Sequence, residues 1–180
     1  MNAAGRIKPF NGDYLHINEA NFGGAKSNLY VTEAVSQNIQ IDKNGVITKT
    51  VTINYKNPYP PSDCSLARGG LCLNAVLRDW IRVYVPKGSQ LIDSQGSEVK
   101  VTSYEDLGKT VFDGFLTVRP LGTATYTLTY RLPFKVKGST LPLLIQKQPG
   151  TDGNKYTISL NGKTVDEFNL TTDKEINLKL

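Results

Sequence analysis

The feature that most constrains the fold of this chain is a regular alternation of apolar and polar residues on both sides of an Asn-Gly pair. Every second residue from 29 to 41 is largely apolar, and residues 47–55 alternate apolar side chains with threonines. A period of two places successive side chains on opposite faces of a β-strand. Asn44-Gly45, between these segments, tolerates the positive φ values of a tight turn. The pattern therefore predicts a β-hairpin.

The same alternation recurs along the rest of the chain. Residues 77–85, 109–119 and 123–132 fit strands, Asn161-Gly162 marks a second hairpin, and residues 104–108 fit a single turn of helix. Val, Ile and Thr make up 41 of the 180 residues, whereas Ala, the best helix former, contributes eight. We therefore expect an all-β fold, an antiparallel β-sandwich that is immunoglobulin-like or related, with about ten strands and minimal helix.

The domain organisation is expected to be simple. Residues 1–25 look like a lead-in segment with one short strand at 14–18, and residues 26–180 form the β-sandwich domain. Residues 1–4 resemble an expression start placed before a fragment. Because no run approaches 18 apolar residues, we expect contact with a membrane only through an anchor of a parent protein, outside this chain.

Two cysteines, Cys64 and Cys72, enclose a short segment that contains Gly69 and Gly70. The glycines make a small disulfide ring sterically easy. Two free thiols, or half of a metal site, are the alternatives, but a metal needs more ligands than the distant His16 supplies. We favour a disulfide, which implies an oxidising, extracytoplasmic setting.

Catalytic signatures are absent from the sequence. The single imidazole, His16, lies in an expected strand, and neither Gly-x-Ser-x-Gly nor a phosphate-binding glycine loop occurs. We therefore expect no enzyme activity, no catalytic residues, no metal and no cofactor. The alternative is an enzyme or enzyme subdomain acting on cell-envelope glycans, which requires two carboxyl groups about 5–9.5 Å apart in a cleft. The net charge of +5 is spread without a basic block, so no nucleic-acid partner is expected.

One strand has the composition of a recognition surface. Arg78, Trp80, Arg82 and Tyr84 share one face of residues 78–85, where rings and guanidinium groups could bind a sugar or an anionic group. Alternatively, a loop covers Trp80 and the arginines pair with acids. A fully buried Trp80 would exclude the ligand hypothesis. The expected partner is a cell-envelope polysaccharide or another surface protein.

Several ordered runs together resemble a known family. They are residues 12–15, 20–30, 55–58, 77–80, 84–89, 108–112 and 145–150. This set, within about residues 5–160, resembles the C-terminal region of a bacterial family of large, membrane-anchored extracytoplasmic proteins of unknown function, common in candidate-phyla bacteria. The resemblance implies a position on the outer face of the membrane and supplies no catalytic motif. We therefore expect a non-enzymatic extracellular module of a cell-surface protein, structural or adhesive.

Overall fold

The hairpin at Asn44-Gly45 is present in the computed structural model, which describes residues 5–180. Gly45 has a φ of 76°, and the Oδ1 of Asp42 accepts hydrogen bonds from the backbone N–H groups of Asn44 and Val46 at 2.8 and 2.9 Å. The flanking strands are β2 (Thr32–Ile41) and β3 (Val46–Lys56), which pair antiparallel. The strongest local signal in the sequence is therefore confirmed.

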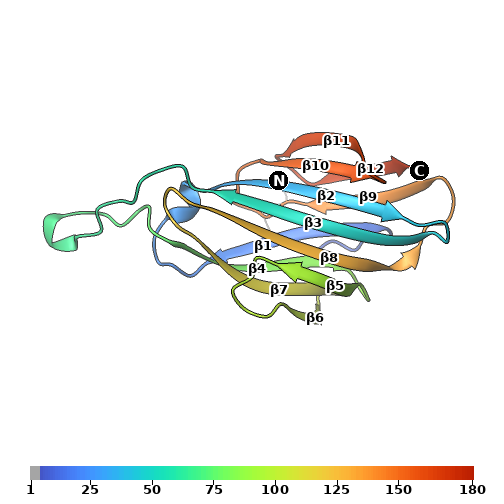
Figure 1. Cartoon of the computed structure of the whole chain (residues 1–180), viewed down its shortest axis with the longest axis horizontal. Helices are drawn as coiled ribbons and strands as arrows, with labels where there is room; N and C mark the ends of the chain where they lie inside the picture. The colour runs from blue at the N-terminus through green and yellow to red at the C-terminus, as the bar shows by residue number, and fades with distance from the viewer. Residues whose placement is uncertain (1–4) are drawn as a thin grey trace.

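Twelve strands in the described residues form two six-stranded sheets that pack face to face (Figure 1). Sheet A contains, in spatial order, β12 (Lys174–Lys179), β9 (Thr140–Gln146), β1 (Asp13–Asn21), β4 (Leu77–Pro86), β7 (Lys109–Val118) and β6 (Thr102–Asp106). Sheet B contains β11 (Lys163–Leu170), β10 (Asn154–Leu160), β2, β3, β8 (Thr123–Lys135) and β5 (Gln90–Gln95). The expected β-sandwich is confirmed.

The strand pairing differs from the expectation in one respect. Both sheets are mixed, because β1 pairs parallel with β9 and β2 pairs parallel with β10. The other pairs are antiparallel. Both parallel pairs join the last four strands to the first two, across more than a hundred residues of sequence. Alternation identifies a strand but carries no information about so distant a partner.

The expected turn of helix at residues 104–108 is wrong. Thr102–Asp106 forms β6, and Leu107-Gly108 makes a tight turn into β7 with φ values of 48° and 75°. Positive φ at both central residues is the conformation of a two-residue hairpin turn, which Leu adopts rarely. Helical structure in the described residues consists of two short 3₁₀ turns, η1 (Ser27–Leu29) and η2 (Leu66–Arg68). No helix among residues 5–180 is long and apolar enough to cross a membrane.

The segment expected to be a lead-in contributes to sheet A. β1 lies between β4 and β9, so residues from Asp13 onward belong to the sandwich. Before β1, Ile7 and Phe10 pack on an apolar cluster on the outer side of sheet A. The Nε2 of Gln146 donates a hydrogen bond to the carbonyl of Arg6 at 2.8 Å. Residues 1–4, the expected artificial start, lie outside the described part of the chain.

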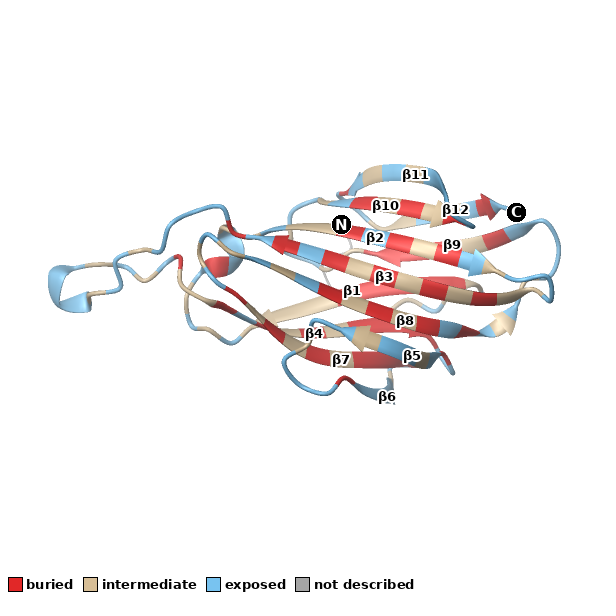
Figure 2. Cartoon of the chain, in the orientation of Figure 1, coloured by how far each residue is buried: buried red, intermediate tan, exposed pale blue. Residues whose placement is uncertain are grey.

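Burial follows the predicted alternation, as the banded strands in Figure 2 show. On β4, Ile81, Val83 and Val85 are fully buried between the sheets. The predicted inward face of β3 is also buried, and threonines occupy the outer positions. The main core is one continuous cluster that both sheets share.

One long loop, residues 57–76, projects from an end of the sandwich (Figure 1). Pro58, Pro60 and Pro61 lie just after β3, where they cannot donate to a ladder, as expected. Cys64 and Cys72 are joined by a disulfide near the tip, which confirms the predicted bridge. We call residues 57–76 the arm.

Candidate functional site

The face predicted for recognition is the outer face of sheet A. Register pairs Trp80 with Ala20 on β1 and with Phe115 on β7. Arg82 lies in the same way between Asn18 and Asp113. Paired residues of antiparallel strands project to the same side, so these side chains gather on one surface.

An aromatic stack forms the centre of this surface. The rings of Phe22 and Trp80 lie 5.7 Å apart between centroids and within 23° of parallel. The guanidinium carbon of Arg82 lies 4.6 Å from the centroid of the Trp80 ring. Trp80 is half-buried, whereas Phe22 is 63% exposed. Trp80 therefore escapes the full burial that would exclude a ligand, but Phe22 is the ring that solvent reaches most easily.

Polar groups surround the stack in fixed positions. The Nε1 of Trp80 donates to Asp113 Oδ1 at 2.7 Å, and the Tyr104 hydroxyl donates to Asp113 Oδ2 at 3.3 Å. The Nη2 of Arg82 donates to Asn18 Oδ1 at 2.5 Å, whereas its buried Nε has no partner in the described structure. Phe22, Trp80, Arg82, Tyr104 and Asp113 together are called the Trp80 platform. It offers aromatic faces beside oriented donors and acceptors, the combination that binds sugars.

Two other predicted residues do not join the platform. Tyr84 is 4% exposed because Ile7 and Phe10 pack over its cluster, and its hydroxyl donates to Asp106 Oδ2 at 3.1 Å. Burial raises the pKa of Tyr84. Tyr84 therefore lies in a covered structural position and not on the predicted ligand-binding face. Arg78 is exposed on the same strand.

Phe22, Tyr104 and Asp113 belong to the platform although no pattern in the sequence predicts it. Phe22 has the parity of the outer face of β1 but lies just beyond that strand. Tyr104 was assigned to a helical turn, and Asp113 belongs to a strand with no distinguishing motif. Only the register of β1, β4, β7 and β6 brings them beside Trp80.

A second group of functional side chains lies between the sheets, near the arm. Two neighbouring strands of each sheet, β1 and β4 in sheet A and β2 and β3 in sheet B, contribute one residue each: Glu19, Asp79, Glu33 and Tyr55. The Tyr55 hydroxyl and the Glu33 carboxyl both hydrogen-bond to Glu19, and Asn154 donates to Glu33 Oε2 at 2.6 Å. We call Glu19, Glu33, Tyr55 and Asp79 the acid cluster.

The surroundings of the acid cluster disfavour its charged forms. Burial raises the pKa of Glu19, and burial together with the charge of Glu19 raises that of Glu33 well above its usual range. Burial and the same neighbour raise the pKa of Asp79 to about 8. Asp79 is 2% exposed and accepts a hydrogen bond from the backbone of Ala20, but its Oδ2 has no partner in the described structure. Desolvation disfavours each charge, and every carboxylate disfavours the others.

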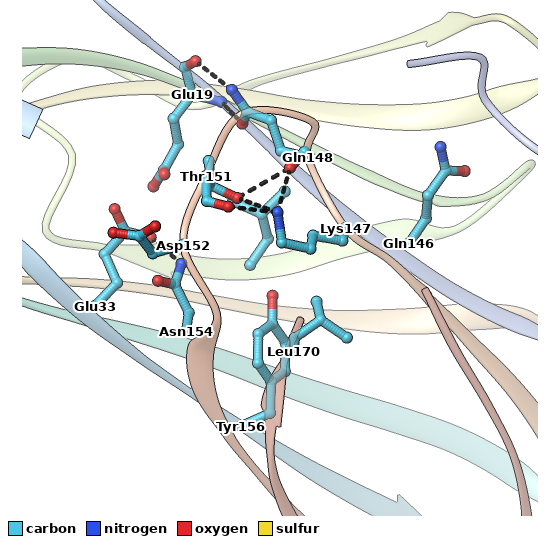
Figure 3. A pocket seen from close by; sticks show the side chains of 11 residues that line it. Glu19, Glu33, Gln146, Lys147, Gln148, Thr151, Asp152, Asn154, Tyr156 and Leu170 are labelled. Carbon is cyan, nitrogen blue, oxygen red and sulfur yellow. Dashed lines mark hydrogen bonds between the residues drawn. The ribbon is translucent and has the colours of Figure 1, made fainter. Parts of the chain in front are cut away.

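A small polar recess adjoins this cluster (Figure 3). The Gln148 amide clamps the backbone of Glu19, with its Oε1 accepting from the N–H at 2.7 Å and its Nε2 donating to the carbonyl at 3.0 Å. The Lys147 ammonium donates to the carbonyls of Gln148 and Thr151. The recess measures about 20 Å³, enough for one water.

The geometry of the acid cluster differs from that of a glycoside hydrolase. Glu19 and Glu33 are in hydrogen-bond contact, whereas the two carboxyl groups of such an enzyme lie about 5–9.5 Å apart. No group of three or more His, Cys, Asp or Glu residues within 5–180 is arranged to hold a metal ion.

The arm carries exposed apolar side chains at its disulfide-closed tip. Leu66 and Leu71 are 80% and 69% exposed, and Tyr59 is 52% exposed nearer its base. The base is fixed by Asn74, whose Nδ2 donates to the carbonyl of Pro60 at 2.8 Å. Exposed leucines on a braced loop are a common feature of docking surfaces.

Comparisons with known proteins add only distant likenesses. No family model and no curated protein matches this chain. A candidate nutrient-binding protein from Legionella pneumophila is 9% identical with a TM-score of 0.43, over 82% of this chain and 54% of that one. An M1 zinc metallopeptidase from Deinococcus radiodurans is 10% identical with a TM-score of 0.38, over 83% of this chain and 39% of that one. The chain thus spans about half or less of each, and scores this low support no inference about its role.

Proposed function

We propose that this chain is a non-enzymatic β-sandwich module of a bacterial cell-surface protein, and that its Trp80 platform binds a cell-envelope polysaccharide. The observation that carries the proposal is the stack of Phe22, Trp80 and Arg82, half-open to solvent on a flat sheet face. A location outside the cytoplasm is supported by the Cys64–Cys72 disulfide, because such bonds persist in oxidising compartments.

The chemistry of the platform suits a saccharide. The exposed ring of Phe22 offers an apolar surface for the C–H face of a sugar, and Trp80 supports that ring from below. Around it, Arg82 and Asp113 present a donor and an acceptor for sugar hydroxyl groups. Because the strands keep these groups in register, the site is formed before ligand arrives and loses little entropy on binding.

Binding to an array of purified bacterial envelope polysaccharides tests this proposal. Phe22→Ala removes an exposed ring without opening the core, so the variant should fold and bind at least tenfold more weakly. Arg82→Gln should weaken binding to anionic saccharides most. Tyr59→Ala, which removes an exposed ring from the arm, is the matched control and should bind normally. Failure of the wild-type chain to bind any saccharide would contradict the proposal.

A second candidate function, docking to another surface protein, is favoured by the exposed Leu66 and Leu71. Envelope preparations from the source bacterium can separate the two functions. Protein docking predicts binding that protease treatment of the envelope abolishes and that Leu66→Ser with Leu71→Ser weakens. Saccharide binding predicts protease-resistant binding that Phe22→Ala weakens. Binding that resists protease and ignores the leucine substitutions would refute the docking role.

A further inference from the structure

A charged pair crosses the centre of the sandwich. Lys49 comes from β3 in sheet B and Asp13 from β1 in sheet A, and their Nζ and Oδ2 atoms are 2.6 Å apart. Both side chains are 0% exposed. Lys49 occupies an inward position of β3 between Ile47 and Val51, where the alternation calls for an apolar residue. Placing two opposite charges there costs more in desolvation than an apolar pair would.

The pair has little support as an ion pair. Besides its contact with Lys49, Asp13 accepts at Oδ1 a hydrogen bond from the backbone N–H of Tyr14 at 2.8 Å. The charge that counters the burial of Lys49 comes from Asp13. Burial raises the pKa of Asp13 and lowers that of Lys49, so each group is driven toward its neutral form. Transfer of one proton from Lys49 to Asp13 yields a neutral amine in contact with a carboxylic acid.

We propose that Lys49 and Asp13 condense into an intramolecular isopeptide bond that ties the two sheets together. The lone pair of Nζ attacks Cγ of the Asp13 carboxylic acid, and the Nζ–Cγ bond forms. One Cγ–O bond then breaks, and the oxygen leaves as water with the acid proton and one amine proton. The product is a neutral amide. The condensation consumes no oxidant, reductant or further reactant.

The site supplies three things that this reaction needs. Fixed contact between Nζ and the carboxyl replaces a bimolecular encounter, which raises the effective concentration of the amine enormously. The apolar surroundings favour the uncharged reactants. They also keep water from returning, so hydrolysis of the amide is suppressed once the water has left.

Tyr130 is placed to assist the reaction. It lies on β8 directly opposite Lys49, it is fully buried, and its hydroxyl has no hydrogen-bond partner in the described structure. Burial, and secondly the charge of Asp13, raise the pKa of Tyr130 well above its usual range. A hydrogen bond from this hydroxyl to the carboxyl oxygen would stabilise the negative charge that develops in the tetrahedral intermediate.

The inference is independent of the proposed ligand. The bond would close a covalent ring between residues 13 and 49 and connect the sheets through the core. It would limit separation of the two sheets whatever the Trp80 platform binds.

Intact-mass spectrometry of the reduced, full-length chain tests the proposal directly. The expected mass is lower than that of the sequence by one water, and digestion should yield a branched peptide that joins Asp13 to Lys49. Lys49→Met, with Asp13→Leu added if the single variant does not fold, should show the full mass. A wild-type chain of full mass after prolonged incubation at pH 5 to 8 would overturn the proposal.

Succinimide formation also removes one water, so the site of the loss must be established. A loss that maps to Asp113-Gly114 or Asp152-Gly153 and reverses in mild base would overturn the proposal, whereas an amide between side chains persists. The role of Tyr130 is tested by following the crosslinked fraction after cell-free synthesis. Tyr130→Phe should slow its appearance at least tenfold, and an unchanged rate would remove Tyr130 from the mechanism.

Discussion

Replacing Asp79 by asparagine should weaken an unusual pH dependence of stability. Asp79 is buried on the inward face of β4, between the core residues Leu77 and Ile81. Glu19, Glu33 and Tyr55, from β1, β2 and β3, lie near it. Its pKa is raised to about 8, whereas an unfolded Asp titrates near 3.9. Between about pH 4 and pH 8 the folded chain therefore binds more protons than the unfolded chain. The stability that this proton supplies is complete below pH 4 and is lost as the pH rises to 8.

The size of the effect follows from these two values. Between pH 4 and pH 7 the difference is about one proton over about three pH units, which corresponds to about 4 kcal/mol. Asn has the same shape and does not ionise, so Asp79→Asn should be more stable than the wild type at pH 8 by up to that amount. At pH 4, where Asp79 is protonated in the folded chain and about half protonated in the unfolded chain, the two proteins should differ by less than about 1 kcal/mol.

Urea denaturation followed through the single tryptophan, Trp80, measures both free energies across pH 4 to 9. The exposed acid Glu175 provides a control, since Glu175→Gln should leave the slope of stability against pH unchanged. The chain carries a net charge of +5, so relief of general repulsion predicts the opposite trend, a gain in stability as the pH rises. A wild-type stability that is flat or rises from pH 5 to 8 would refute the reasoning.

Two further predictions concern the arm and a turn. Because the Cys64–Cys72 ring lies on the projecting arm, replacing both cysteines by serine should change the global free energy of unfolding by less than about 1 kcal/mol, below the roughly 2.5 kcal/mol expected for a ring of this size. Limited proteolysis within residues 64–72 should become faster. A large drop in the urea midpoint would contradict this prediction. Gly96 has a φ of 83°, and an added Cβ would lie 1.8 Å from the carbonyl oxygen of Thr125. Gly96→Ala should therefore lower the melting temperature much more than Gly138→Ala. At Gly138 the space is open, and only the backbone conformation costs about 1–2 kcal/mol. Equal decreases in the melting temperature of the two variants would disprove the steric argument.

Local signals in the sequence predicted most of the elements. The Asn161-Gly162 turn joins β10 and β11 with positive φ at both residues, as its sequence indicates. The small ring closed by Cys64 and Cys72 was also predictable, since a nine-residue segment with two glycines can close without help from the rest of the fold. The turn at Leu107-Gly108 was not predicted, because a leucine at positive φ has no sequence signature.

The candidate site was predicted only in part. The parity of Trp80 and Arg82 on the outer face of β4 was correct, because strand geometry alone fixes it. Tyr84 has the same parity, yet Ile7 and Phe10 cover it. What lies over a sheet face depends on a segment seventy residues away, which no local pattern records.

The sequence by itself determined most of the strands, which side of those strands faces the core and most of the turns, since these depend on neighbours within a few residues. The tertiary structure alone decided which strands are adjacent. That adjacency places Phe22 on Trp80, gathers Glu19, Glu33 and Asp79 into one cluster, and brings Lys49 into contact with Asp13. Each of these contacts joins segments that are distant in the sequence, and the chemistry of the acids and of Lys49 follows from surroundings that only the packed sheets create.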